Sequence, residues 1–217
     1  ANDILFLSHT PPIQGIIQES QQHVEPNNSE WQPRLEQIFS EILKSKMDYL
    51  QISFIGNAQQ GKEILTVNRF HNSVVKTPAA RLNQLAQDAF FSSTSQKNLG
   101  SIHFSTVSLR RDLGALVKPY QAIVKVATPI FNLITGEEFG VLMIEVDFGQ
   151  FVESLAQHEL RDINFYLANE AGDYLYHPDN TMRYGFEFDK QFLMQQQFPS
   201  LNAVFTNNVE QQAYSEL

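Results

Sequence analysis

Cysteine is absent from this 217-residue chain. Its absence excludes disulfide bonds, thiolate nucleophiles and cysteine-ligated zinc sites. Basic residues are also few, since 15 lysines and arginines stand against 24 acidic residues and give a net charge of −9. Nucleic-acid binding requires basic side chains that neutralise phosphates, so we expect no nucleic-acid partner.

Long apolar runs are absent as well. No stretch of about 18 apolar residues is available to span a membrane, and the first residues, Ala1-Asn2-Asp3, lack the basic start and apolar stretch of a signal peptide. Any membrane anchor is therefore expected outside this sequence. The 42% of hydrophobic residues still provides a sizeable core, in one large domain or two small ones.

Catalytic and metal-binding signatures are missing too. The six histidines show no His-x-x-x-His spacing, and the chain has no Gly-x-Ser-x-Gly elbow, phosphate loop or Gly-x-Gly-x-x-Gly motif. We therefore expect no catalytic residues, no metal site and no cofactor in this part of the protein.

Apolar residues at helical spacing predict helices in the first 48 residues. Residues 1–24 have this spacing, but Pro11 and Pro12 cannot both lie inside an undistorted helix, so two helical pieces around a kink are expected. Residues 31–44 place their apolar side chains on one stripe, which predicts an amphipathic helix.

From Tyr49 onward the apolar period changes to two, which predicts strands. Five strands are expected, at residues 49–55, 63–69, 101–109, 122–131 and 139–147. A helix is predicted between the second and third strands, at 79–91. The predicted fold class is α+β, with one antiparallel five-stranded sheet and a helical layer on one face.

The strand pattern begins again near the C-terminus. A helix predicted at 150–158 is followed by a second strand, turn and strand within 163–177. The remaining residues show only helical stretches, at 192–197 and 209–217, and no second apolar hairpin. We therefore divide the chain into three parts, a helical region (1–48), a sheet module (49–158) and an incomplete second module (159–217).

Several short motifs occur in an order that resembles a known family. They include Thr10-Pro-Pro-Ile-Gln-Gly15, Trp31-x-x-Arg34-Leu35, Tyr49-x-Gln51-Ile52, Ala127-Thr-Pro-Ile-Phe131 and Asn169-Glu-Ala-Gly-Asp-Tyr-Leu-Tyr-His-Pro-Asp179. Together they make nearly the whole chain similar to the double Cache (double PDC) sensor regions of membrane-bound diguanylate cyclases and sensor histidine kinases. The resemblance implies long N-terminal helices, a PAS-like membrane-distal Cache module with a small-molecule pocket, and a partial membrane-proximal Cache module.

The sequence departs from the family's pattern at candidate pocket positions. Where relatives tend to carry arginine, this chain has Ser53 and Lys125, and where a Gln-x-Lys helix motif is usual it has Asn83-Gln84-Leu85. For this reason a ligand cannot be transferred from any relative.

Five residues are candidates for ligand binding: Lys125, Asp147, Gln51, Arg69 and Ser105. Lys125 interrupts an otherwise apolar strand, and charged residues are rarely buried without a partner. Glu145 and Asp147 share one face of the neighbouring strand, because alternate residues point the same way. The pattern fits either a charged pocket wall or a salt bridge on a solvated face, and Asp147 is the expected counter-group of Lys125 in the empty site.

Two other features have simple structural interpretations. His177-Pro178-Asp179 matches the tripeptide of J-domain cochaperones, but strand residues lead into it here, so a proline turn with Asp179 as turn former is expected. Trp31 and Phe39 are expected to pack in the core rather than stack on a ligand, because their spacing fits a buried helical stripe.

The leading hypothesis is a non-enzymatic periplasmic sensor module of an inner-membrane signalling protein. It binds a small polar or carboxylated metabolite, such as an amino acid, and signals to a cytoplasmic output domain, either a diguanylate cyclase or a histidine kinase. A homodimer through the N-terminal helix is a further expectation. Two rivals remain open, a protein-interaction or structural module without a small-molecule ligand and an enzyme of unrecognised type. A cavity lined by Lys125 and Asp147 favours the sensor, and a filled sheet face favours the interaction module.

Overall fold

The computed structural model describes residues 2–24, 28–70, 73–112, 114–158 and 163–206. Its N-terminal helices are α1 (Asn2–Ser8), α2 (Pro11–Gln21) and α3 (Gln32–Ser45). Pro11 and Pro12 occupy the first positions of α2, where proline is tolerated, so the predicted break in this region is confirmed. The helices have 7, 11 and 14 residues, and the long ones that the resemblance implied are not seen among the described residues.

The main sheet is antiparallel throughout, as predicted, but it has seven strands instead of five. Its order is β3-β2-β1-β9-β8-β4, and β5 also pairs with β8. The bounds are β1 (Tyr49–Gly56), β2 (Glu63–Phe70), β3 (Ser73–Lys76), β4 (His103–Phe104), β5 (Ser108–Leu109), β8 (Ala122–Phe131) and β9 (Glu138–Asp147). The predicted strand at 101–109 is split into β4 and β5, because the Ser105 hydroxyl accepts the Lys125 backbone N–H and interrupts the ladder.

The predicted helix at 79–91 is wrong. The structure has a 3₁₀ turn, η2 (Ala79–Arg81), and a later helix, α5 (Ala89–Ser95), which Asp88 caps by accepting from the Phe91 N–H. The residues between them bond instead to the turn around α4 (Ala58–Gly61), with Leu85 N donating to Gly61 O and Glu63 N to Asn83 O. These long-range bonds outweigh the local preference for a helix.

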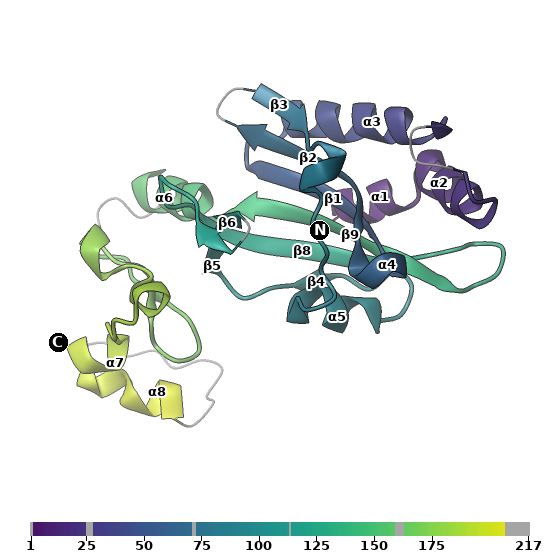
Figure 1. Cartoon of the computed structure of the whole chain (residues 1–217). Coiled ribbons are helices and arrows are strands. Elements are labelled where there is room, and N and C mark those ends of the chain that lie inside the picture. The colour runs from purple at the N-terminus through teal and green to yellow at the C-terminus, as the bar shows by residue number, and fades with distance from the viewer. Residues whose placement is uncertain (1, 25–27, 71–72, 113, 159–162, 207–217) are drawn as a thin grey trace.

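The two faces of the sheet are covered by different elements (Figure 1). Helices α1, α2 and α3 cover one face and share its apolar core with every second residue of the central strands, including Ile52, Phe54, Val126 and Ile144. Phe39 is fully buried in this core and Trp31 packs against it, as predicted. On the opposite face, α5 packs Phe91 onto a smaller apolar cluster, Ile55, Ala127, Val141 and Met143.

Beyond the sheet the chain continues through α6 (Phe148–His158), which confirms the predicted helix there. Short elements follow: β10 (Leu167–Ala168), β11 (Tyr174–Tyr176), η3 (Asn180–Met182), η4 (Gly185–Phe188), α7 (Met194–Gln197), η5 (Pro199–Leu201) and α8 (Asn202–Thr206). Asp179 caps η3 by accepting from the Thr181 N–H, so the turn interpretation of His177–Asp179 is confirmed. The helical stretch predicted at 209–217 lies outside the described residues. Across the described ranges, we find no helix with the length and hydropathy needed to cross a membrane.

Candidate ligand-binding site

The sheet face opposite α1, α2 and α3 carries a row of polar side chains, which we call the polar face. Strand register brings them together, since Glu145 on β9 stands opposite both Gln51 on β1 and Lys125 on β8. Gln51 in turn stands opposite Asn68 on β2. Residues directly opposite one another project to the same side of a sheet, so these four side chains are neighbours.

Arg110 is the central cation of the polar face. It lies between β5 and the small hairpin of β6 (Arg111–Asp112) and β7 (Ala115–Leu116). Its Nε donates to Glu145 Oε2 at 3.1 Å, and a terminal guanidinium nitrogen donates to Asn68 Oδ1 at 3.2 Å and Gln51 Oε1 at 3.4 Å. Arg110 and Glu145 are only 7% and 8% exposed, so this is a buried ion pair. Sequence reasoning missed Arg110, because a loop arginine has no periodic signal.

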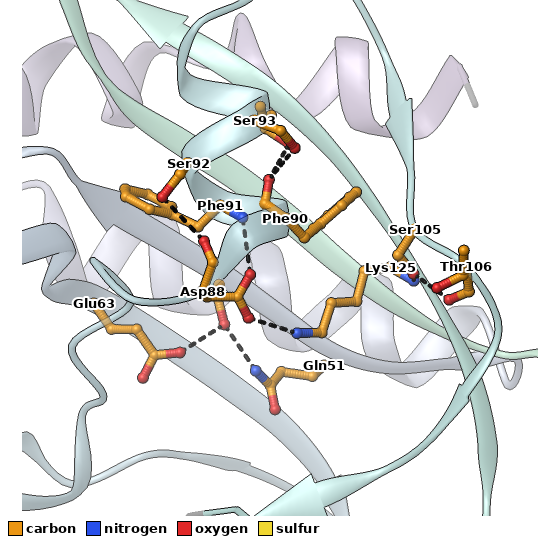
Figure 2. A network of polar contacts seen from close by, with 12 residues as sticks. Gln51, Glu63, Asp88, Phe90, Phe91, Ser92, Ser93, Ser105, Thr106 and Lys125 are labelled. Atoms are coloured by element: carbon orange, nitrogen blue, oxygen red, sulfur yellow. Dashed lines mark hydrogen bonds and ion pairs between the residues drawn. The ribbon is translucent and has the colours of Figure 1, made fainter. Parts of the chain in front are cut away.

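Lys125 pairs with Asp88, not with Asp147. The Lys125 Nζ lies 3.2 Å from Asp88 Oδ2, at the start of α5, as Figure 2 shows. Asp147 was therefore the wrong counter-group, and the reason is local. Its carboxylate accepts the Gln150 N–H at the start of α6, and its strand position is opposite Ile123 instead of Lys125.

Gln51 belongs to a second chain of hydrogen bonds along the polar face. Its amide donates to the Ser53 hydroxyl at 3.0 Å, and that hydroxyl donates to Glu63 Oε1 at 3.2 Å. Thr66 also donates to Ser53, and Asn83 N–H donates to the other oxygen of Glu63. Glu63 is 2% exposed, so the polar face holds a second deeply buried carboxyl group beside that of Glu145.

Arg69 and Ser105, two further candidates from the sequence, do not join these side-chain networks of the polar face. The Arg69 side chain belongs to the opposite face of the sheet, since its neighbour Asn68 contributes to the polar face, and its guanidinium donates to the Tyr49 and Lys46 carbonyls. Ser105 exchanges hydrogen bonds with the Lys125 backbone. It therefore fixes the strand that carries Lys125 without projecting across the sheet.

Burial controls the electrostatics of the two acidic residues at this end of β9. Desolvation raises the pKa of Glu145, although the nearby charges of Arg110 and Lys125 act in the opposite direction. Desolvation also raises the pKa of Asp147, opposed by N–H groups at the start of α6. In both residues desolvation outweighs the neighbouring charges and donors, so both pKa values lie above the ordinary value of the group.

Two cavities lie away from the polar face. One, of about 280 Å³, is an apolar groove on the helix-covered face, lined by residues that include Ile4, Val124, Val146 and Phe151. The other, of about 430 Å³, lies in the C-terminal part and is lined by residues that include His177, Asp179 and Gln197. Neither is lined by Lys125 or Asp147. Within the described residues no group of three or more histidine, aspartate or glutamate side chains is placed to hold a metal ion.

Comparison with known proteins gives a consistent family. A model described as "Bacterial histidine kinase, sensor domain" matches residues 16–216. A domain assigned to a sensory box/GGDEF family protein of Vibrio parahaemolyticus has a TM-score of 0.78 at 21% identity, covering 98% of this chain and 76% of that one. The extracellular domain of the histidine kinase vpHK1S-Z8 has a TM-score of 0.76 at 19% identity, covering 97% of this chain and 72% of that one.

A more distant structural neighbour is the ligand-binding domain of the Campylobacter jejuni chemoreceptor Tlp3, solved in complex with L-valine. Its TM-score is 0.54 at 12% identity, and the match covers 82% of this chain and 60% of that one. A search of the curated proteins found no significant match. At these identities the structural likenesses show the fold.

Proposed function

The chain belongs to the family of bacterial histidine kinase sensor domains, and from this premise we propose that it senses a small polar or carboxylated metabolite at the polar face. One observation carries the proposal, namely the buried pair of Arg110 and Glu145 on the face of the sheet opposite the main core. Two nearby charges, Lys125 and Asp88, extend it.

These ion pairs suit a site whose groups bind one another while it is empty. A ligand carboxylate would replace Glu145 or Asp88 as the partner of Arg110 or Lys125, and a ligand ammonium would take the carboxylate that is released. For an amino acid ligand the exchange keeps the exchanged charges paired, which limits the cost of binding. The L-valine complex of the Campylobacter jejuni chemoreceptor supports a small ligand that carries a carboxylate and an ammonium group, as an amino acid does.

The proposed site revises the residues expected from the sequence. Lys125 and Gln51 remain, and Arg110, Glu145, Asp88 and Asn68 are added to them. Ser105 supports Lys125 through the backbone, and Asp147 stands at the edge of the site, next to α6. Arg69 is left out because its guanidinium closes the junction between α3 and β1 on the other face.

The family also suggests how the module is placed in a whole protein. In this proposal residues 49–158 form the membrane-distal Cache module and residues 159–217 part of a membrane-proximal one, both on the periplasmic side. In the same proposal the module belongs to a membrane-anchored protein with a cytoplasmic output domain, a histidine kinase or a diguanylate cyclase. Two copies pair through the N-terminal helices.

A thermal-shift screen of amino acids, including L-valine, together with carboxylates and amines tests the proposal. A cognate ligand at a hundredfold excess over its dissociation constant stabilises the fold by about 2.7 kcal/mol. In a chain of this size that raises the melting temperature by about 5–11 °C. Lys125→Ala should remove most of the shift for an anionic or zwitterionic ligand.

Lys76→Ala provides the matched control. It also breaks a lysine–carboxylate pair, with Glu36, but that pair joins β3, at the far edge of the sheet, to α3. An equal shift in the parent, the Lys76→Ala variant and the Lys125→Ala variant would show that the ligand binds elsewhere.

A second candidate function is an interaction module without a small-molecule ligand. The observation that favours it is that the charged side chains of the polar face bond to one another and that neither of these two cavities is lined by Lys125. A screen in which no compound class shifts the melting temperature would support this alternative over the sensor.

A further inference from the structure

The C-terminal part of the chain bonds directly to the residues on either side of Arg110. Glu187, in η4, accepts the Leu109 N–H through Oε1 at 2.8 Å and the Arg111 guanidinium through Oε2 at 2.7 Å. One carboxylate therefore holds the residues on both sides of Arg110. The Glu187 side chain is only 9% exposed, although its partner Arg111 is half-exposed at 46%.

The backbone around Arg110 connects the Glu187 contacts to the polar face. Leu109 belongs to β5 and pairs with Ala122, while Arg110 N donates to Gln121 O at 2.8 Å. At Arg110 the chain leaves the main sheet for the β6–β7 hairpin, and Val117 N donates to the Arg110 carbonyl. Because its own backbone is bonded to Gln121, directly before β8, and its neighbours are bonded to Glu187, the Arg110 backbone cannot shift without straining one of these bonds.

The segment that carries Glu187 is held in an uncommon conformation. Tyr184 precedes η4 with φ 55° and Asp189 follows it with φ 57°, so non-glycine residues in the left-handed region stand at both ends. Such residues persist only where their surroundings over-determine them. A change in the contacts of Glu187 therefore changes what keeps η4 in place.

Two other contacts between the sheet module and the C-terminal part, both among the described residues, do not involve the neighbours of Arg110. Arg183 forms an ion pair with Glu153 on α6, and the Phe188 ring lies 5.1 Å from that of Tyr120. These contacts hold the parts together, whereas the Glu187 contact alone among them touches the residues that flank the central cation of the proposed site.

We propose that Glu187 couples the charge state of the polar face to the C-terminal part of the chain, by gripping Leu109 and Arg111 on either side of Arg110. The inference rests on the proposed function, because it takes the polar face as the sensing site. A ligand that draws Arg110 away from Glu145 weakens the contacts of Glu187 with Leu109 and Arg111. By thermodynamic linkage this coupling is reciprocal. The factor by which a bound ligand changes the stability of the Glu187 contacts is also the factor by which those contacts change the affinity for the ligand.

Hydrogen exchange on the whole 217-residue chain tests the coupling without any ligand. Glu145→Gln removes the charge that holds Arg110 and stands in for the displacement by a ligand. Peptides covering residues 183–190 should then exchange about fivefold faster, which is at the lower end of common allosteric couplings. Since no ligand is used, this test succeeds or fails independently of the thermal-shift screen.

Two further variants, each combined with Glu145→Gln, test whether the effect passes through Glu187. In a Glu187→Ala background, residues 183–190 exchange fast from the start, and adding Glu145→Gln should bring no further change. In a Glu153→Gln background, which breaks the other charged contact, Glu145→Gln should still accelerate exchange. The same acceleration in the Glu187→Ala background would overturn the proposal.

A milder substitution can be used if the Glu145→Gln variant does not fold. Asn68→Ala removes only a neutral acceptor of Arg110 and should accelerate the same peptides to a smaller extent. Unchanged exchange at residues 183–190 in every variant that folds would refute the coupling, even if peptides covering 108–112 respond.

Discussion

The Arg110–Glu145 pair gives a stability prediction that separates a buried site from a solvated surface. The two side chains are 9% and 10% exposed. Removing one partner of a buried pair costs about 3–5 kcal/mol, because the other charge is left without compensation. Since each kcal/mol lowers the melting temperature of a chain of this size by about 2–4 °C, Arg110→Met should lower it by about 6–20 °C.

The pH dependence of this variant follows from Glu145. Burial already raises its pKa, and Arg110→Met removes the cation that most opposes the rise. A carboxyl group whose pKa is higher in the folded state contributes most stability below its unfolded pKa of about 4.3, and that contribution is lost as the pH rises through the folded pKa. The deficit of Arg110→Met should therefore be largest at neutral pH and shrink as the pH falls toward about 4.

Urea unfolding followed by circular dichroism at pH 7 and at about pH 4.5 measures both effects. The Arg110→Met/Glu145→Leu double variant has no unpaired charge and should be more stable at pH 7 than Arg110→Met alone. Gln51 and Asn68 lose a donor in both variants, so that cost cancels in the comparison. A loss below about 1 kcal/mol that does not vary with pH is the value of an exposed pair, and it would refute the buried site.

Two further substitutions test the sheet and the cap. Gly140→Ala should cost more than about 4 kcal/mol or prevent folding, because its Cβ would lie 1.9 Å from the Ile55 carbonyl oxygen; Gly149→Ala, which meets only ordinary contacts, is the control in circular dichroism and urea unfolding. Asp88→Ala should lower the free energy of unfolding by about 1 kcal/mol or more, because it removes the cap of α5. Lys125→Ala leaves that cap intact and should lower it by less than about 1 kcal/mol. Equal urea midpoints for the two variants would show that the cap contributes nothing.

The periodicity of the sequence determined the elements that have a long, one-sided apolar pattern. The amphipathic stripe around Phe39 forms α3, and the alternating residues of β1, β2, β8 and β9 form the centre of an antiparallel sheet. Lys125 was recognisable as a candidate because an ionised group inside an apolar strand is exceptional. The short strand β3 has no such pattern and was missed, whereas the helix predicted at 79–91 was wrong because long-range hydrogen bonds hold that segment.

The tertiary structure decided which charges meet. Arg110, Asp88 and Glu187 lie in loops or at helix ends, and their positions depend on where the chain leaves the sheet rather than on any local period. Arg69 shows how sharp the dependence on register is, because one position along β2 separates it from Asn68 and puts it on the other face. Local pattern specifies the side chains that a strand buries, but the partners of Arg110, Lys125 and Glu187 come from segments 35 to 78 residues distant in sequence, and only the packed fold brings these segments together.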